Sequence, residues 1–250
     1  MMDLLRSEWI KLRTIRVTYV LTIIAAVFPL LIVVLVAALI GDVNDFSGSD
    51  LVTMITQSMV LSALLLGVVS TLSITNEYGN GTIRISFAAT PNRRKVLVAK
   101  GLVALAFSMA VTTIVMLVAF AAGSTILNNR DASLSFDSHT NTALVGLVLL
   151  SGMLCLLGYG LGLIIRNSAA SVTLLVLWPL LLENLARIVL SVAKVKDPTT
   201  WLPYQSAMRM VSPPDFDGGD SSGLSAGIPL AVLVIVLIGV GIVINERRDA

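Results

Sequence analysis

The chain has 250 residues, of which 56% are hydrophobic and 13% are charged, and its mean hydropathy is +0.92. Soluble domains carry about 25% charged residues, so this deficit predicts a membrane protein with many spans and no large soluble domain. The net charge of only +2 argues against a protein that binds nucleic acid. The single cysteine, Cys155, lies in an apolar run and cannot form an internal disulfide.

Residues 1–16 are predicted to form an amphipathic helix ahead of the first span. On a helix of about 100° per residue, the basic residues lie off the apolar side, whereas Glu8 falls within it. The apolar side consists of Met1, Leu4, Leu5, Trp9, Leu12 and Ile15. A basic helix with a tryptophan on its apolar side suits the surface of a membrane. The alternative is a plain basic flank that sets the topology.

Six apolar segments follow, and each is long enough to cross a bilayer. About 20 helical residues are needed to cover a hydrocarbon core about 30 Å thick. The predicted spans are residues 19–40, 54–75, 96–127, 143–165, 168–192 and 228–244. The sequence therefore predicts an all-α membrane protein with a single transmembrane domain over residues 1–250.

Two kinds of residue predict how these spans bend and pack. Pro29 lies in the first span and Pro179 in the fifth, and both are expected to kink their helices. Gly158 and Gly162 are four residues apart in the fourth span, a spacing that favours close contact with another helix.

The basic residues are divided unequally between the two sets of connections. Twelve of the 17 lie at the N-terminus, between the second and third spans or just inside the third (Lys100), between the fourth and fifth, and at the C-terminus. Nine aspartates lie in the other connections. The positive-inside rule then places both termini and the loop of residues 76–95 in the cytoplasm, with residues 193–227 outside. Trp201 and Tyr204 favour a segment of this outer loop that dips into the membrane or caps the bundle, with an ordinary loop as the alternative.

The sequence offers little for catalysis. The one histidine, His139, lies in an outer loop, which leaves no histidine-based triad and no metal cluster. The phosphate-binding pattern Gly-x-x-x-x-Gly-Lys-[Ser/Thr] does not occur, so ATP hydrolysis would need another subunit. An ion-coupled carrier needs ionisable groups within the membrane. Glu183 and Arg187 are such groups, but their i to i+4 spacing favours a structural ion pair, with a substrate path as the alternative.

The loop between the second and third spans has a pattern that a topology signal does not need. Gly79 and Gly81 are predicted to end the second span, and Thr82 to cap a short helix that stops at Pro91. This pattern predicts an amphipathic helix across the cytoplasmic end of the bundle, docked on a soluble partner. The residues presented to that partner would be Glu77, Arg84, Arg93 and Arg94.

The same loop resembles that of the membrane subunits of type-2 ATP-binding-cassette transporters, a family of bacterial drug, antibiotic and polysaccharide exporters. In that family a Glu is followed by Gly-Thr, Pro, and then an Arg and a Lys at the start of the third span. The matching residues are Glu77, Gly81, Thr82, Pro91, Arg93 or Arg94, and Lys100. The basic N-terminal helix with Trp9 and the six-span layout match as well.

The resemblance implies a permease of the bacterial plasma membrane that a separate ATPase subunit drives. The residues expected to couple to that ATPase are Glu77, Gly81, Thr82, Arg84, Pro91, Arg93, Arg94, Lys100 and Trp9. ATP and Mg²⁺ would bind the ATPase, and this chain would bind no cofactor. A second copy or a sister permease would complete a path for a drug, peptide antibiotic or lipid.

By position, that path would be lined by Gln57, Ser58, Ser62 and Glu183. The rival hypotheses are an ion-coupled secondary transporter, and a membrane scaffold or immunity protein without transport activity.

Overall fold

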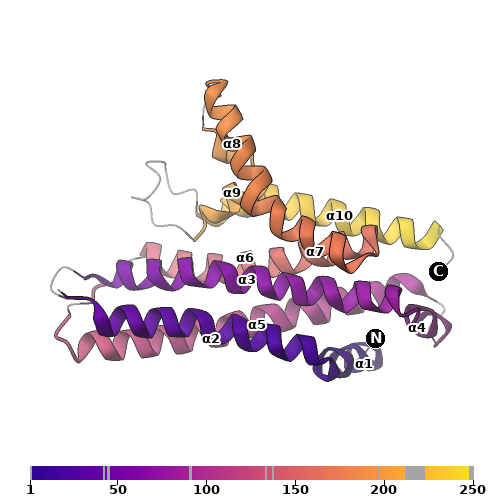
Figure 1. The fold of residues 1–250 in the computed structure, drawn as a ribbon, viewed down its shortest axis with the longest axis horizontal. Coiled ribbons are helices and arrows are strands. Elements are labelled where there is room, and N and C mark those ends of the chain that lie inside the picture. The colour runs from indigo at the N-terminus through magenta and orange to yellow at the C-terminus, as the bar shows by residue number, and fades with distance from the viewer. Residues whose placement is uncertain are drawn as a thin grey trace.

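The computed structural model describes residues 2–41, 43, 46–89, 92–132, 134–136, 138–195, 197–211 and 223–247. Within these residues the chain forms helices and no strand. Four long helices lie side by side along the longest dimension of the molecule (Figure 1). They are α2 (Arg16–Leu39), α3 (Gly48–Gly79), α5 (Arg93–Asn128) and α6 (Ser138–Ile165).

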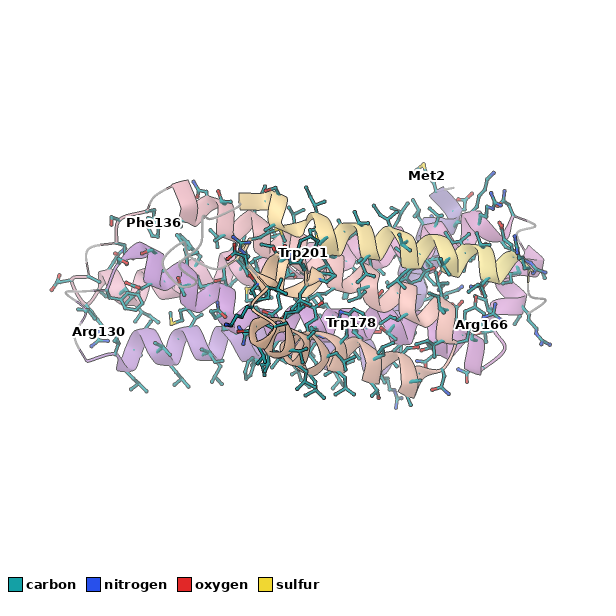
Figure 2. All side chains as sticks on the ribbon, turned by 90° about the horizontal axis from the view of Figure 1, so that it is seen from above. Met2, Arg130, Phe136, Arg166, Trp178 and Trp201 are labelled. Carbon is teal, nitrogen blue, oxygen red and sulfur yellow. The ribbon has the colours of Figure 1, made fainter. Side chains whose placement is uncertain are left out.

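The helix α10 (Ile228–Arg247) runs along the same bundle, and both chain ends lie at one end of it (Figure 1). We call this the terminal end, because α1 (Met2–Thr14), α4 (Ile83–Ala89) and the last turn of α10 all lie there. The other end, which carries Arg130 and Phe136, is the distal end (Figure 2).

Among the residues that the structure describes, six helical segments are long and apolar enough to cross a bilayer, which confirms the predicted all-α membrane fold. They are Arg16–Leu39, Gly48–Gly79, Arg93–Asn128, Thr140–Ile165, Ser168–Val192 and Gly223–Arg247. The second and third have 32 and 36 residues, or about 48 and 54 Å at 1.5 Å per residue. Both therefore extend beyond a hydrocarbon core of about 30 Å.

α3 and α6 approach each other along a line of glycines. A Cβ atom built at Gly158 would lie 2.5 Å from the carbonyl oxygen of Gly67, and one at Gly162 would lie 2.5 Å from Cγ2 of Ile74. Likewise, a Cβ at Gly67 would lie 2.9 Å from the carbonyl oxygen of Leu154. Because these distances are well inside van der Waals contact, the predicted close packing at Gly158 and Gly162 is confirmed.

A buried hydroxyl cluster joins α5 to α6 at the middle of the bundle. Ser151 Oγ lies 2.7 Å from Thr112 Oγ1 and 2.8 Å from Ser108 Oγ. Hydroxyl groups in an apolar environment are costly unless they bond to one another, so these three hold the two helices in register.

The fifth candidate span is bent. α7 (Ser168–Leu177) leads into a π-helical turn, η1 (Trp178–Leu182), and α8 (Glu183–Val192) then turns away from the bundle (Figure 1). Pro179 lies in η1, where its missing N–H and its ring disrupt the regular α-helical bonding. The predicted distortion at Pro179 is confirmed, whereas α2 continues as one helix through Pro29.

After α8 the chain returns to the bundle at α9 and does not lie beyond the distal end (Figure 1). Trp178 and Trp201 both lie near the middle of the bundle's length, between Arg166 at the terminal end and Arg130 at the distal end (Figure 2). η2 (Pro198–Thr200) comes just before Trp201, and α9 (Pro203–Met208) follows it. η4 (Gly223–Gly227) then leads into α10.

Residues 203–211, which we call the re-entrant segment, are part of the main core. The buried side chains of this segment are Tyr204, Ser206, Ala207, Met210 and Val211. A Cβ atom at Gly146 of α6 would lie 2.6 Å from the carbonyl oxygen of Met210, so the segment is seated tightly against α6. Of the alternatives for the outer loop, the structure supports a segment that folds back into the bundle.

Candidate functional site

The turn after α3 is built on a glycine. α3 ends at Gly79 and α4 begins at Ile83, and Gly81 between them has a φ of +69°, which glycine adopts without steric cost. Thr82 immediately precedes α4, and its hydroxyl donates to the carbonyl oxygen of Glu77 at 3.5 Å. The predicted break and the short helix after it are confirmed, although the hydroxyl of Thr82 closes α3 instead of capping α4.

α4 is anchored to the bundle through Ile83, which is 2% exposed. Its side chain belongs to a small apolar cluster with Ile74, Leu97, Tyr159 and Leu163, bordered by Tyr78 and Phe87. The next two residues lie on the surface, because Arg84 is exposed and Ile85 is 71% exposed. One side of α4 therefore packs against the bundle, and another side is exposed at the surface.

Four charged side chains from three helices meet beside α4, and we call them the ionic cluster. They are Glu8 and Lys11 of α1, Glu77 of α3 and Lys100 of α5. Lys100 Nζ bonds to the carboxylate of Glu8 and lies 2.8 Å from Glu77 Oε1. Lys11 Nζ lies 2.7 Å from Glu8 Oε1 and 3.2 Å from Glu77 Oε1. Each carboxylate therefore contacts both ammonium groups.

Two of these charges are withdrawn from solvent, because Glu8 is 3% and Lys100 is 4% exposed. Removing a charge from water costs several kcal/mol, which a cluster offsets only if opposite charges balance. Here two acids face two bases. Burial lowers the pKa of Lys11, but its hydrogen bond to Glu8 and the charge of Glu77 outweigh that effect, so the pKa is raised and Lys11 stays charged.

The ionic cluster also reaches α4, because Lys11 Nζ donates to Ser86 Oγ at 3.1 Å. α1 lies along α5, where Leu12 packs with Val69 and Val103, and Trp9 meets Phe107 edge to face with 6.0 Å between the ring centroids. Side chains at the terminal end thus join α1 and α4 to the end of α3 and to the start of α5.

The predicted exposure of Glu77 is wrong. The sequence places Glu77 among the residues presented to a partner, but its side chain is only 13% exposed and faces the ammonium groups of Lys11 and Lys100. The attraction of two nearby cations explains this inward orientation. Lys100, also predicted as a coupling residue, is the buried centre of the same cluster.

The remaining predicted coupling residues occupy different positions. Arg93 lies over the ring of Phe87, with its Cζ 5.4 Å from the ring centroid. Arg94 is exposed and forms a two-point ion pair with Glu246 of α10, in which Nη2 lies 2.7 Å from Oε2. Pro91 lies outside the described residues.

Asn245 of α10 adds a second polar contact at the terminal end. Its side chain is 2% exposed, and its Nδ2 donates to the carbonyl oxygens of Leu163 and Gly241 at 3.1 and 2.6 Å. Its Oδ1 accepts from Arg166 Nη2 at 2.6 Å and from the hydroxyl of Tyr78. The sequence interpretation missed this residue, although an amide at the end of an apolar run was a usable signal.

The four residues predicted to line a path are separated by the structure. Gln57 is exposed on α3, whereas Ser58 and Ser62 are buried, at 8% and 3% exposure. Glu183 is also buried, at 3% exposure. Its predicted ion pair with Arg187 is wrong, because Arg187 is exposed and the carboxylate accepts hydrogen bonds from Trp178, Tyr204 and Gln205.

In the described part of the chain, no three His, Cys, Asp or Glu side chains gather into a set that could hold a metal ion. A family model described as "ABC-2 family transporter protein" matches residues 4–180, more than half of the chain. The matched residues include the whole ionic cluster and α4, and they end before Glu183 and α9. No curated protein matches the chain.

Proposed function

We propose that this chain, which belongs to the ABC-2 family of transporter proteins, is the membrane-spanning permease of an exporter that a separate ATPase subunit drives. The observation that carries this proposal is the ionic cluster. It joins α1 and α4, which lie across the terminal end, to the long helices α3 and α5. A displacement of α4 by a bound ATPase would therefore reach both long helices directly.

The charge distribution supports a cytoplasmic location for the terminal end. Both chain ends lie there (Figure 1), together with the basic residues of α1 and of the start of α5. The positive-inside rule assigns such an end to the cytoplasm, where an ATPase has access to ATP and Mg²⁺. ATP and Mg²⁺ would bind to that subunit.

The open side of α4 supports a docking surface for the ATPase. Ile85 is 71% exposed and adjoins the exposed Arg84. An apolar anchor beside a charged rim is the arrangement that protein interfaces use. Glu77, which faces inward, would act by holding the helix ends together and not by touching the partner.

Substitution of this surface is expected to remove the ATPase without unfolding the permease. We expect the pair Arg84→Glu and Ile85→Asp to lower the amount of co-purified ATPase about tenfold, which corresponds to about 1.4 kcal/mol. The permease would be tagged and co-expressed with an ATP-binding subunit of the same organism. Lys194→Glu repeats the charge reversal of Arg84→Glu at an exposed residue outside the terminal end and should retain the ATPase.

Other outcomes of this experiment point to specific alternatives. Equal retention by all variants would exclude α4 as the main docking site and make α1 the next candidate. If the unaltered chain binds no ATPase but transports its cargo, the ion-coupled carrier is correct. If it binds no ATPase and transports nothing, a scaffold or immunity protein is the better hypothesis.

Gln57 supports a path along α3, between this chain and a second copy or a sister permease. Its amide is exposed on a membrane-spanning helix, and an amide facing lipid would be unsatisfied and costly. A water-filled or substrate-filled path would remove that cost. The apolar surface of the described spans suits a drug, peptide antibiotic or lipid as cargo.

Obstruction of this path is expected to impair export while docking persists. We expect Gln57→Trp to lower resistance of the cells to a panel of amphipathic drugs at least fivefold, with unchanged ATPase co-purification. Val118→Trp places the same ring on an exposed position of α5 and should have no effect. Resistance that is equal in the two variants would count against Gln57 as a lining residue.

A further inference from the structure

Glu183 is a buried carboxylate that the proposed coupling does not use. It is 3% exposed, and three N–H groups donate to it. Its Oε1 accepts from Trp178 Nε1 at 2.8 Å and from the backbone N–H of Tyr204 at 2.9 Å. Its Oε2 accepts from the backbone N–H of Gln205 at 2.9 Å. The carboxylate thus joins the bend in the fifth span to the re-entrant segment.

Local chain geometry explains why these groups meet. The π-helical turn closes with the backbone N–H of Glu183 bonded to the carbonyl oxygen of Trp178, so residues five apart lie on one side of the helix. α9 begins at Pro203, which has no N–H, and the next two N–H groups have no partner within their own helix. A carboxylate is the favourable acceptor there, because the first turn of a helix carries partial positive charge.

This junction is the main contact between α8 and the rest of the bundle. Glu183 is the only buried residue of α8, and the exposed apolar residues of this helix include Leu185, Ile188, Val189 and Val192. The re-entrant segment, by contrast, is firmly seated through Tyr204, Ala207 and Met210. Two of the three hydrogen bonds, from Tyr204 and Gln205, cross from the re-entrant segment to α8, and the side chain of Gln205 adds a bond to Asn184 Oδ1 at 3.4 Å. Any movement of α8 relative to the bundle must therefore either break these bonds or move the re-entrant segment.

We propose that Glu183 is the latch of a gate that lies between the middle of the bundle and its distal end, and that the carboxylate makes α8 and the re-entrant segment move as one unit. At rest the carboxylate acts together with the buried side chains of the re-entrant segment to keep the segment against α6. When the fifth span moves, the carboxylate draws the segment aside and opens the path. The proposal rests on the proposed transport function, but it does not follow from the family match, since residues 4–180 exclude both Glu183 and α9.

Cysteine labelling tests the latch directly. Cys155→Ala removes the one native cysteine, and Met210→Cys places a single thiol at a position that is 2% exposed. A membrane-impermeant maleimide would be added to intact cells. We expect Glu183→Ala to raise the labelling rate at least tenfold, and Glu183→Gln to raise it less, because an amide oxygen still accepts one of the N–H groups. Arg187→Ala, on the exposed side of α8, should label at the original rate.

Labelling during ATP turnover separates a latch from a merely structural contact. In nanodiscs with the ATPase subunit, ATP should accelerate labelling of the Met210→Cys protein. After Glu183→Ala, labelling should be fast and independent of ATP. The latch is overturned if the Glu183→Ala protein labels as slowly as the Arg187→Ala protein, or if ATP still changes the labelling rate of the Glu183→Ala protein. It is also overturned if ATP does not change the labelling rate of the protein in which Glu183 is intact.

The amount of co-purified ATPase distinguishes failure of the latch from failure of the proposed function. The Glu183 variants change no residue of the terminal end and should retain the ATPase in full. A permease that binds ATPase but shows no effect of Glu183→Ala contradicts only the latch. The labelling of intact cells needs no ATPase, so it decides the latch even if the unaltered chain binds none.

Discussion

Replacement of Lys100 by methionine is expected to release α1 from the bundle and to abolish binding of an ATPase subunit. The change leaves Glu8 and Glu77 facing each other with Lys11 as their shared cation. Removal of one partner from a buried ion pair costs about 3–5 kcal/mol, because a charge remains buried without compensation. Glu8, at 3% exposure, is the charge that would be left.

The release of α1 has a direct measurement. Trypsin should cleave at Arg6 or Arg13 several times faster in the Lys100→Met protein, and the melting temperature in detergent should fall. Lys95→Met makes the same chemical change at an exposed position one to two turns earlier in α5 and should leave both values unchanged. If Lys100→Met behaves like Lys95→Met, the ionic cluster does not hold α1.

Restoration of charge balance provides a second test of the same reasoning. Adding Glu8→Gln to Lys100→Met leaves one acid, Glu77, opposite one base, Lys11, which lie 3.2 Å apart. We expect this double variant to recover most of the lost melting temperature, because the uncompensated buried charge is gone. Further loss in the double variant would show that the effect of Lys100→Met is one of packing and not of charge.

The ionic cluster shows how far the sequence alone could go. Glu8 lies among the apolar residues of the N-terminal helix, and a carboxylate in that position needs a buried cation. Lys100 and Glu77 were identified from the loop pattern, yet as residues for a partner. What the pattern could not supply was the direction of each side chain, which depends on how α1 packs against α5.

The spans were predictable for a different reason. A run of about 20 apolar residues is required by the thickness of the bilayer, so composition alone reveals it. The direction in which a helix runs relative to the bundle is not determined by composition. α8 points away from the bundle because of the π-helical turn at Pro179, and hydropathy does not predict a π-helical turn.

The junction at Glu183 was beyond the reach of residue patterns. Arg187 stands at the favourable i to i+4 spacing, so side-chain reasoning selected it as the partner. The actual partners include the backbone N–H groups of Tyr204 and Gln205, which every non-proline residue carries. Only the return of the chain along the bundle brings them to the carboxylate.

The contact between α3 and α6 gives the second large expected effect. We expect Gly158→Ala to lower the melting temperature sharply, and Gly158→Val to leave little folded protein in detergent. The added Cβ would lie 2.5 Å from the carbonyl oxygen of Gly67 and 2.5 Å from Thr71 Oγ1. Overpacking of a tight core costs about 1–3 kcal/mol, and valine adds two further methyl groups at the same point.

The identity of the obstructing atom decides the size of this effect. A flexible side chain could rotate away from a new Cβ, but the carbonyl oxygen of Gly67 moves only if α3 moves. Gly239→Ala in α10 is the matched control, because no atom lies within 4 Å of its built Cβ and alanine favours a helix over glycine by about 1 kcal/mol. Gly239→Ala should therefore keep or raise the melting temperature. Equal melting temperatures for the two alanine variants would mean that α3 and α6 can separate without loss, and that the glycines do not set their distance.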